Sequence, residues 1–320
     1  PRAVMHFNRS PMSQSPAAVP SLSPIPYIVM LATALCFSTN IIFGRYVAPE
    51  THPFVLAFTR WLAVAAILAP FALSQSRGQI IKVVRENWPL LIALGVLGMG
   101  VSGGGVYWGL QMTTATNATL IYSVAPIVIL ILERIFRNRT IAGRELIGAA
   151  VAITGVAMIV LKGDLATLRA MQFNPGDLLI AAATLSWAGY SVLFKSPSLS
   201  ATHAITLFCV IAAFGALANL PFAIVPLLSG SGLPGTPQAW QALGGIIVVS
   251  SLMAFTGYQF GVRRLGPSVA GLFMFLMTPF GVILAVTFLG ETLATYQMIA
   301  IGAVMIGVIT ATFPKNLLKL

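Results

Sequence analysis

The stretch Val269–Leu289, VAGLFMFLMTPFGVILAVTFL, decides the fold class of this chain. It carries no charged residue, and its only hydroxyl side chains are Thr278 and Thr287. An α-helix needs about 20 consecutive apolar residues to cross the hydrocarbon core of a bilayer. The stretch is therefore predicted to be a membrane-spanning helix.

Nine further apolar runs surround this stretch, separated by charges, prolines or glycine clusters. They run approximately over Ile25–Val47, Pro53–Leu73, Trp88–Leu110, Ala115–Ile135, Ile141–Leu161, Gly176–Phe194, Thr202–Leu228, Trp240–Val262 and Leu293–Phe313. Most connections are short, so neighbouring helices are expected to be antiparallel in one bundle. The predicted fold class is an all-α polytopic membrane protein with ten transmembrane helices.

The composition agrees with a chain whose main solvent is lipid. Of the 320 residues, 58% are hydrophobic and 8% are charged, whereas about 25% are charged in an ordinary soluble domain. These charges are too few to cover the surface of a soluble globule of this size, which excludes that class of protein. The lipid bilayer is thus the first expected partner.

The net charge of +11 results from 18 Lys and Arg against 7 Asp and Glu, and ten spans divide the basic residues unequally. The side of both termini holds fourteen of them: Arg2, Arg9, Arg77, Lys82, Arg85, Arg134, Arg137, Arg139, Arg144, Lys195, Arg263, Arg264, Lys315 and Lys319. The other side holds Arg45, Lys162 and Arg169, and Arg60 falls within a span. Cytoplasmic loops of membrane proteins are enriched in Lys and Arg, so both termini are predicted to be cytoplasmic. The charge then requires no nucleic-acid partner.

The two halves of the chain match each other at a nearly constant offset. Phe37 and Arg45 correspond to Trp187 and Lys195, 150 residues later. At an offset of 152 or 153, Trp88, Gly109, Ala118, Leu120, Pro126 and Gly155 correspond to Trp240, Gly261, Ala270, Leu272, Pro279 and Gly307. We interpret the chain as a duplicated five-helix unit, residues 25–162 and 175–313. Residues 1–24, rich in Pro and Ser, are expected to form a disordered tail, and 314–320 a C-terminal tail.

Five helices per unit is an odd number, so the second unit must cross the membrane upside down relative to the first. Such inverted repeats supply two related conformations, in which one half rocks against the other and opens a midplane cavity to alternate sides. This arrangement favours a transporter that works by alternating access.

The arrangement resembles the drug/metabolite transporter superfamily, in its ten-helix branch of two EamA domains. The residues that carry the resemblance are the aromatic-to-basic pairs Phe37 with Arg45 and Trp187 with Lys195, the run Phe58, Thr59, Arg60, the series Pro279, Leu289, Gly290, Glu291, and the Gly-rich fifth and tenth helices. More narrowly, the chain is similar to the YddG-type aromatic amino-acid exporters. The resemblance implies a central cavity, a bacterial inner-membrane location and export of amino acids and related small metabolites. The first half departs from the pattern, since Asn138 stands where the second half has Glu291.

Polar and aromatic side chains within spans are candidates for a substrate site, because such groups must face the bundle interior or a wet cavity. The candidates are Asn40, Tyr107, Trp108, Gln111, Trp187, Tyr190, Tyr258 and Gln259. Trp187 and Tyr190 lie three residues apart and share one helix face, and Trp108 and Gln111 repeat that spacing. Flat apolar rings with polar edges would suit an amino acid with an aromatic or long apolar side chain. Trp88 and Trp240, at span starts, are expected in the interfacial belts.

Four charged residues have two interpretations each. Arg60 either reaches out of its span towards Glu50 or binds a substrate carboxylate. Arg45 and Lys195, at span ends, either anchor the helices or take part in transport. Glu133 is expected to pair with one of the arginines that follow it, or else to act as a proton-coupling acid.

Helix-breaking residues predict the irregular places of the bundle. Pro126 and Pro279 each remove a backbone hydrogen bond at corresponding places, which predicts paired kinks in spans four and nine. Gly148, Gly155, Gly302 and Gly307 are expected at packing or dimer surfaces.

Other function classes receive less support from the residues. A membrane enzyme would need paired acids, a metal set or a nucleophile with its base, and His6, His52 and His203 form no such set. No cofactor or metal is expected. A channel, a receptor, and a carrier of sugar nucleotides or phosphorylated sugars stay as alternatives.

Overall fold

The structure is a computed structural model that describes residues 23–313 except 76, 170, 231 and 291, and all regular secondary structure in that part of the chain is helical. It confirms the all-α polytopic class with ten spans. They are α1 (Ile25–Val47), α2 (Pro53–Gln75), α3–η1–α4 (Arg77–Gly95, Val96–Gly105, Val106–Leu110), α5–α6 (Ala115–Tyr122, Ala125–Arg137), α7 (Gly143–Val160), α9 (Pro175–Phe194), α10 (Ala204–Leu228), α11–η3–α12 (Pro237–Gly245, Ile246–Met253, Ala254–Leu265), α13–η4–α14 (Pro267–Phe273, Met274–Leu276, Met277–Leu289) and α15 (Thr295–Thr312). Two short helices, α8 (Leu165–Arg169) and η2 (Pro197–Leu199), lie in connections.

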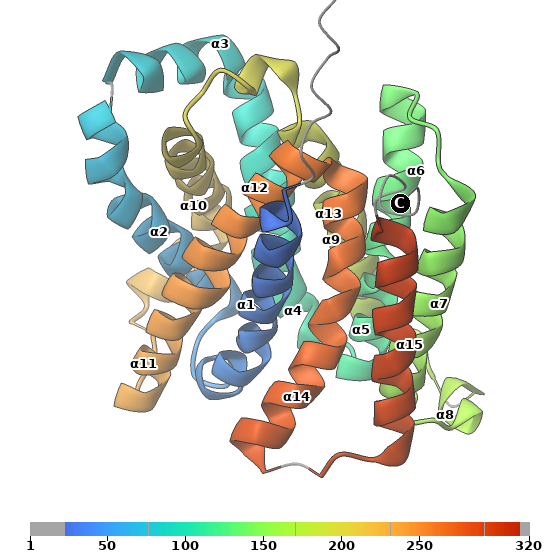
Figure 1. The fold of residues 1–320 in the computed structure, drawn as a ribbon. Coiled ribbons are helices and arrows are strands. Elements are labelled where there is room, and N and C mark those ends of the chain that lie inside the picture. The colour runs from blue at the N-terminus through green and yellow to red at the C-terminus, as the bar shows by residue number, and fades with distance from the viewer. Residues whose placement is uncertain (1–22, 76, 170, 231, 291, 314–320) are drawn as a thin grey trace, which may run out of the picture.

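The helices run alternately between two faces of the bundle. We call the face where α1 begins and α15 ends the terminal face; it is uppermost in Figure 1, and α8 lies at the opposite face. The predicted tails lie outside the described residues apart from Ser23 and Pro24, and so does Glu291.

Equivalent helices of the two halves pack against each other. The most extensive helix contacts join α2 to α10 and α7 to α15, that is, span two to span seven and span five to span ten. Gly148 and Gly307 allow the second contact: a Cβ on Gly148 would lie 2.5 Å from the Gly307 carbonyl oxygen, and one on Gly307 would lie 2.5 Å from the Ala152 nitrogen. Gly155 approaches Ala300 and Val304 in the same way, whereas Gly302 has nothing within 4 Å. Three of the four glycines therefore form an internal packing surface.

Both halves contain a π-helical segment at the same place. It covers Val96–Gly105 in span three and Ile246–Met253 in span eight, where the starting residues are 150 apart. π-Helices have i→i+5 hydrogen bonds, are rare, and occur frequently at functional sites. The match therefore extends the duplication to an irregular feature of the backbone.

Spans four and nine are interrupted just before the two prolines. α5 ends at Tyr122 and α6 begins at Ala125, so Pro126 lies in the first turn of α6. In the second half, the 3₁₀ turn Met274–Leu276 separates α13 from α14, and Pro279 lies in the first turn of α14. Proline is tolerated in a first turn, where its missing N–H has no helical partner to lose.

The third span begins earlier than its apolar run indicates. We expected it from Trp88, but α3 starts at Arg77 and has a non-helical residue at Asn87, φ −129° and ψ 18°. Pro89 explains the break, because the residue shortly before a proline is disfavoured in a continuous helix. The polar segment ahead of the break has no apolar run, so hydrophobicity alone gives no sign of it.

The α7–α15 contact predicts a sharp difference between two glycines of one helix. Gly307→Ala should lower the free energy of unfolding by about 1–3 kcal/mol, because the new methyl group meets backbone atoms that cannot move aside. Gly302→Ala, with open space at its Cβ, should be neutral or stabilising by up to about 1 kcal/mol. Thermal unfolding of both variants in detergent tests this, and equal midpoints would contradict the packing role.

Candidate substrate site

Aromatic side chains from three spans, α1, α9 and α12, meet in the bundle interior. Trp187 stacks on Tyr190 at a centroid distance of 5.4 Å and lies 4.8 Å from the Tyr258 ring. Phe37 and Phe255 approach the Trp187 ring edge-on at 5.9 and 5.6 Å. We call these five residues the aromatic cluster. Edge-to-face and offset-stacked arrangements at such distances are those that aromatic rings prefer.

The phenol groups of this cluster are hydrogen-bonded although they are buried. Gln259 donates from Nε2 to the Tyr190 hydroxyl at 3.0 Å, and the Tyr258 hydroxyl lies 2.7 Å from Ser191 Oγ. Tyr190 and Tyr258 are both 0% exposed. Gly98 of the π segment makes room for the Tyr190 ring, since a Cβ there would lie 2.5 Å from Tyr190 Cδ2. The structure thus brings four predicted residues together: Trp187, Tyr190, Tyr258 and Gln259.

A second group surrounds Arg60, which is 6% exposed. Its guanidinium donates to Ser251 Oγ at 2.5 Å, to the Tyr107 hydroxyl at 3.1 Å and to the Ser250 carbonyl at 3.2 Å. Tyr107 in turn donates to Asn40 Oδ1 at 3.2 Å. We call Arg60, Tyr107, Asn40, Ser250 and Ser251 the arginine cluster. It joins two predicted residues, Asn40 and Tyr107, to the buried cation.

The π segment η3 explains why Ser250 and Ser251 meet Arg60. Ser251 Oγ donates to the Ile246 carbonyl five residues earlier, at 2.8 Å, while it accepts the Arg60 Nε–H. The wide turn also leaves the Ser250 carbonyl accessible to the Arg60 side chain. Neither serine was predicted as a site residue. The pair of adjacent hydroxyls within an apolar span was the available signal.

Trp61 connects the two clusters. The Arg60 guanidinium carbon lies 4.8 Å from the Trp61 ring centre, and the Phe255 ring centre lies 4.7 Å from it. The Trp61 Nε1–H is buried and has no hydrogen-bond partner among the described residues. A buried donor without a partner costs about 1–3 kcal/mol.

The two clusters contain one interaction in two copies. Asn40 and Tyr190 are equivalent at an offset of 150, and Tyr107 and Gln259 at an offset of 152. Tyr107 bonds to Asn40 in the first half, and Gln259 bonds to Tyr190 in the second. Each is a bond between a phenol and an amide that joins the first span of a half to its third span. The residue types are exchanged between the copies, but the contact is kept.

The remaining predicted aromatic and amide residues lie elsewhere. Trp108 is 44% exposed and approaches Phe54, and Gln111 is exposed just beyond the end of α4. The π segment before them changes which face of the span points inward, so Tyr107 rather than Trp108 meets Arg60. Trp88 and Trp240, 56% and 49% exposed, lie near span starts.

Charged residues at the span ends are engaged in separate contacts. Glu50 does not bind Arg60. Its carboxylate accepts hydrogen bonds from the Gly235 and Thr236 N–H groups and from the Thr236 hydroxyl. The bond from the Thr236 hydroxyl is the main reason why the pKa of Glu50 is lowered. Arg45 is exposed at the last turn of α1. Lys195 donates to the Arg263 carbonyl at 2.5 Å at the terminal face. Arg60 is therefore buried within the bundle, and does not extend to Glu50.

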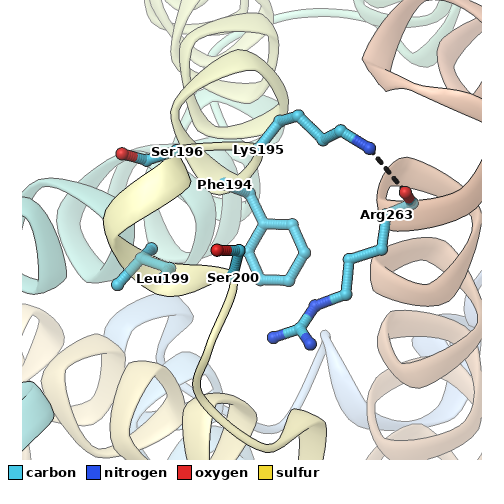
Figure 2. A pocket seen from close by; sticks show the side chains of 6 residues that line it. All are labelled: Phe194, Lys195, Ser196, Leu199, Ser200 and Arg263. Atoms are coloured by element: carbon cyan, nitrogen blue, oxygen red, sulfur yellow. Dashed lines mark hydrogen bonds between the residues drawn. The ribbon is translucent and has the colours of Figure 1, made fainter. Parts of the chain in front are cut away.

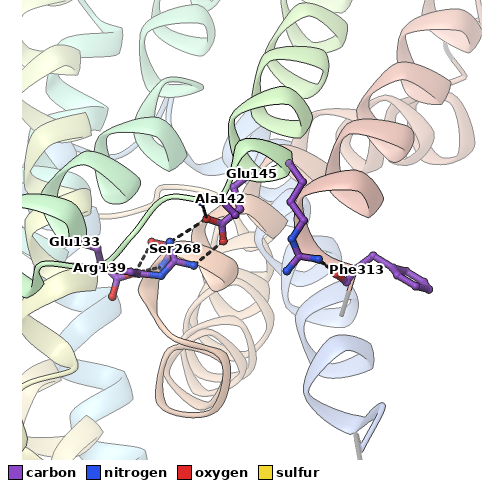
Figure 3. Close-up of polar contacts among 7 residues, drawn as sticks. Glu133, Arg139, Ala142, Glu145, Ser268 and Phe313 are labelled. Carbon is purple, nitrogen blue, oxygen red and sulfur yellow. Dashed lines mark hydrogen bonds and ion pairs between the residues drawn. The ribbon is translucent and has the colours of Figure 1, made fainter. Parts of the chain in front are cut away.

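Glu133 belongs to a polar network at the terminal face, which Figure 3 shows. Its carboxylate accepts from the Ser268 N–H at 3.0 Å and from the Ser268 hydroxyl, and lies 3.7 Å from Arg139 Nε. Arg139 also forms a two-pronged ion pair with Glu145, at 3.1 and 2.5 Å. Glu145 Oε2 accepts the Ala142 N–H at the start of α7. The network ties α6, α7 and α13 together.

This network gives Glu133 a structural role that a stability measurement can test. Glu133→Gln should lower the free energy of unfolding by about 1–3 kcal/mol, because it removes a buried charge that Arg139 and Ser268 stabilise. Glu86→Gln, an exposed acid on α3, should change it by less than about 0.5 kcal/mol. Thermal unfolding of the two variants side by side would refute the role if both keep the wild-type midpoint.

The described residues contain no group of three or more His, Cys, Asp or Glu side chains that could hold a metal ion.

Comparison with known proteins gives related chains that cover most of the sequence. The chain is 25% identical over 291 residues to the uncharacterized transporter YyaM of Bacillus subtilis, covering 89% of this chain and 93% of that one. It is 26% identical over 271 residues to the uncharacterized inner membrane transporter YedA of Escherichia coli strain K12, covering 83% of each. A solved crystal structure of another protein matches the fold with a TM-score of 0.73 at 17% sequence identity, over 92% of this chain and 99% of that one.

The family model of the EamA-like transporters matches the chain twice, over residues 24–161 and 174–313. The two matches together cover both halves of the bundle, and they confirm the resemblance to the drug/metabolite transporter superfamily. The chain therefore belongs to the EamA-like transporter family.

Proposed function

We propose that this transporter exports amino acids, aromatic and other apolar ones, and related small metabolites by alternating access. The proposal includes a bacterial inner-membrane location with both termini in the cytoplasm, so that the terminal face is cytoplasmic. The division of basic residues, fourteen against three, supports that orientation. The name of the Escherichia coli relative as an inner membrane transporter supports the location.

The phenol–amide bond in two copies is the observation that carries alternating access. Both copies are formed, but they differ in exposure: Tyr190 and Gln259 are buried, whereas Asn40 and Tyr107 are half-buried. Val124 and Leu276, equivalent positions just before the second helix of spans four and nine, show the same difference at 37% and 1% exposed. A difference in exposure between equivalent positions of the two halves supports a carrier whose halves exchange these two states.

The arginine cluster supports a substrate with a carboxylate. A charge within a membrane span is costly and is normally paired or marks a substrate pathway. No carboxylate among the described residues lies within ion-pair distance of Arg60, and its three hydrogen bonds go to neutral oxygens. A guanidinium has five N–H donors, so two remain for a carboxylate, which it binds in a forked geometry.

The aromatic cluster supports an apolar or aromatic side chain on the same substrate. Trp61 lies between Arg60 and Phe255. A ligand whose carboxylate bonds to Arg60 would therefore extend its side chain towards the rings, where aromatic surfaces favour a further ring.

Since Glu133 is engaged with Arg139 and Ser268, we expect Glu133→Gln to keep the wild-type pH dependence of flux.

The carboxylate-binding role of Arg60 is tested by counterflow in proteoliposomes with two matched substrates. Wild-type protein should exchange radiolabelled phenylalanine at least about tenfold faster than phenylalaninamide, since losing a charge-assisted contact costs about 1.5–3 kcal/mol. Arg60→Gln should slow phenylalanine exchange to the rate of the amide, and Arg60→Lys should recover part of it, because lysine keeps the charge without the fork.

Arg169→Gln, at an exposed position of α8, is the matched control and should behave as wild type. An Arg60→Gln variant that slows both substrates equally would reduce Arg60 to a structural role. Absence of exchange for every amino acid, with well-folded protein, would move the function to another metabolite class.

The role of the aromatic cluster has its own test. Trp187→Ala should reduce phenylalanine exchange about tenfold through loss of ring contacts worth about 1.5 kcal/mol. Trp187→Phe, which keeps a ring, should retain a larger part of the activity, and Trp88→Ala should retain all of it because Trp88 is 56% exposed. Unchanged exchange in Trp187→Ala with normal membrane insertion would remove Trp187 from the site.

A further inference from the structure

A small cavity opens at the terminal face between the ends of two spans. Its volume is about 230 Å³, and its walls are Phe194, Lys195, Ser196, Leu199, Ser200 and Arg263. They come from the end of α9, the η2 turn and the end of α12 (Figure 2). Pockets for drug-sized ligands have volumes of about 300–1,000 Å³, so this one suits a compact group.

The charge of the lining is entirely positive. Lys195 and Arg263 are its only ionisable groups, and the hydroxyls of Ser196 and Ser200 complete its polar surface. Arg137 lies close by, where it donates to the Val192 carbonyl at 3.0 Å. The pKa of Lys195 is lowered, first by burial and then by the charges of Arg137 and Arg263. Glu133 acts against this shift, but its carboxylate is held by Ser268 and Arg139.

Among the described residues, neither cation has a partner for every N–H group. Lys195 donates one of its three N–H groups to the Arg263 carbonyl, and Arg263 donates two of its five to the Thr202 carbonyl, at 3.3 and 3.2 Å. The Arg263 guanidinium also lies 5.6 Å from the Phe194 ring centre. Figure 2 shows Lys195 reaching across towards α12 and Arg263 reaching back towards Phe194. The remaining N–H groups of both cations are left to donate to a bound acceptor.

We propose that this cavity is a binding site for a phosphate-type oxyanion, held by Lys195 and Arg263. Its place at the ends of two spans is the depth of lipid headgroups, and basic pockets between transmembrane helices bind anionic headgroups. The phosphodiester of an anionic phospholipid and free inorganic phosphate share this chemistry. A bound oxyanion would link the ends of α9 and α12, the spans that also carry the Tyr190–Gln259 bond.

The experiment titrates the purified full chain in detergent at constant ionic strength and records the thermal unfolding midpoint. Three probes are used: short-chain phosphatidylglycerol, short-chain phosphatidylcholine and inorganic phosphate. Phosphatidylglycerol should raise the midpoint at concentrations at which phosphatidylcholine does not. Lys195→Gln and Arg263→Gln should each weaken the apparent affinity about tenfold or more, as expected for a lost charge-assisted contact.

The matched control is Arg264→Gln, which removes the same charge from the neighbouring residue that does not line the cavity. It should respond as wild type, and Lys195→Arg should keep most of the response because it keeps the charge. A rise with phosphatidylglycerol alone identifies a lipid headgroup, and an equal rise with phosphate identifies a free oxyanion. The site would be overturned if neither phosphatidylglycerol nor phosphate raises the midpoint of the wild-type protein. It would also be overturned if Arg264→Gln loses the rise to the same extent as Lys195→Gln. The first criterion uses wild-type protein alone, so it holds even if a glutamine variant is too unstable to titrate.

Discussion

Backbone hydrogen bonding inside a lipid solvent is the constraint on which this structure depends. Hydrocarbon offers no partner to an N–H or C=O group, so every interruption of a helix must be satisfied from within the bundle. Three of the interruptions have such a side-chain partner. Asn219 donates to the Met99 carbonyl in the first π segment, Arg60 to the Ser250 carbonyl in the second, and Ser38 to the Met277 carbonyl after the break in span nine. Repair of the broken helices therefore brings polar side chains into the middle of the membrane, where a substrate site needs them.

Duplication determines where those interruptions fall. The π segments, the breaks before Pro126 and Pro279, and the side-chain caps that Glu145 and Gln297 give to α7 and α15 recur in both halves. The two halves differ in their charged side chains. Arg60 lies only in the first half, and Glu133 joins the network at the terminal face without an acidic counterpart in the second. The repeated frame supplies two equivalent ends, while the unequal charges lie at the proposed binding region, with Arg60, and at the terminal face, with Glu133.

Much of the fold follows from the sequence because long apolar runs have one stable solution in a bilayer, which is a spanning helix. The constant offset between Phe37 with Arg45 and Trp187 with Lys195 carries the duplication in the same direct way. The second π segment could not be foreseen, since Ile246–Met253 contains no glycine or proline and has the pattern of an ordinary apolar helix. Regular helical spacing therefore does not separate Tyr107, which contacts Arg60, from Trp108 and Gln111, which are exposed. The contact of Ser250 and Ser251 with Arg60 depends on how α2 crosses η3.

The central claim is that the two halves exchange states during transport, so that the exposed position of one half becomes buried while its equivalent in the other half becomes exposed. The reactivity of a cysteine at each of two equivalent positions, 124 and 276, measures this directly. Val124→Cys and Leu276→Cys would be made separately in a chain with Cys36 and Cys209 replaced by alanine, and labelled with a water-soluble maleimide with and without saturating phenylalanine. The account predicts opposite changes: substrate slows labelling at position 124, which is 37% exposed here, and speeds it at position 276, which is 1% exposed. Rates that change in the same direction, or that both stay constant while phenylalanine exchange proceeds, would contradict it.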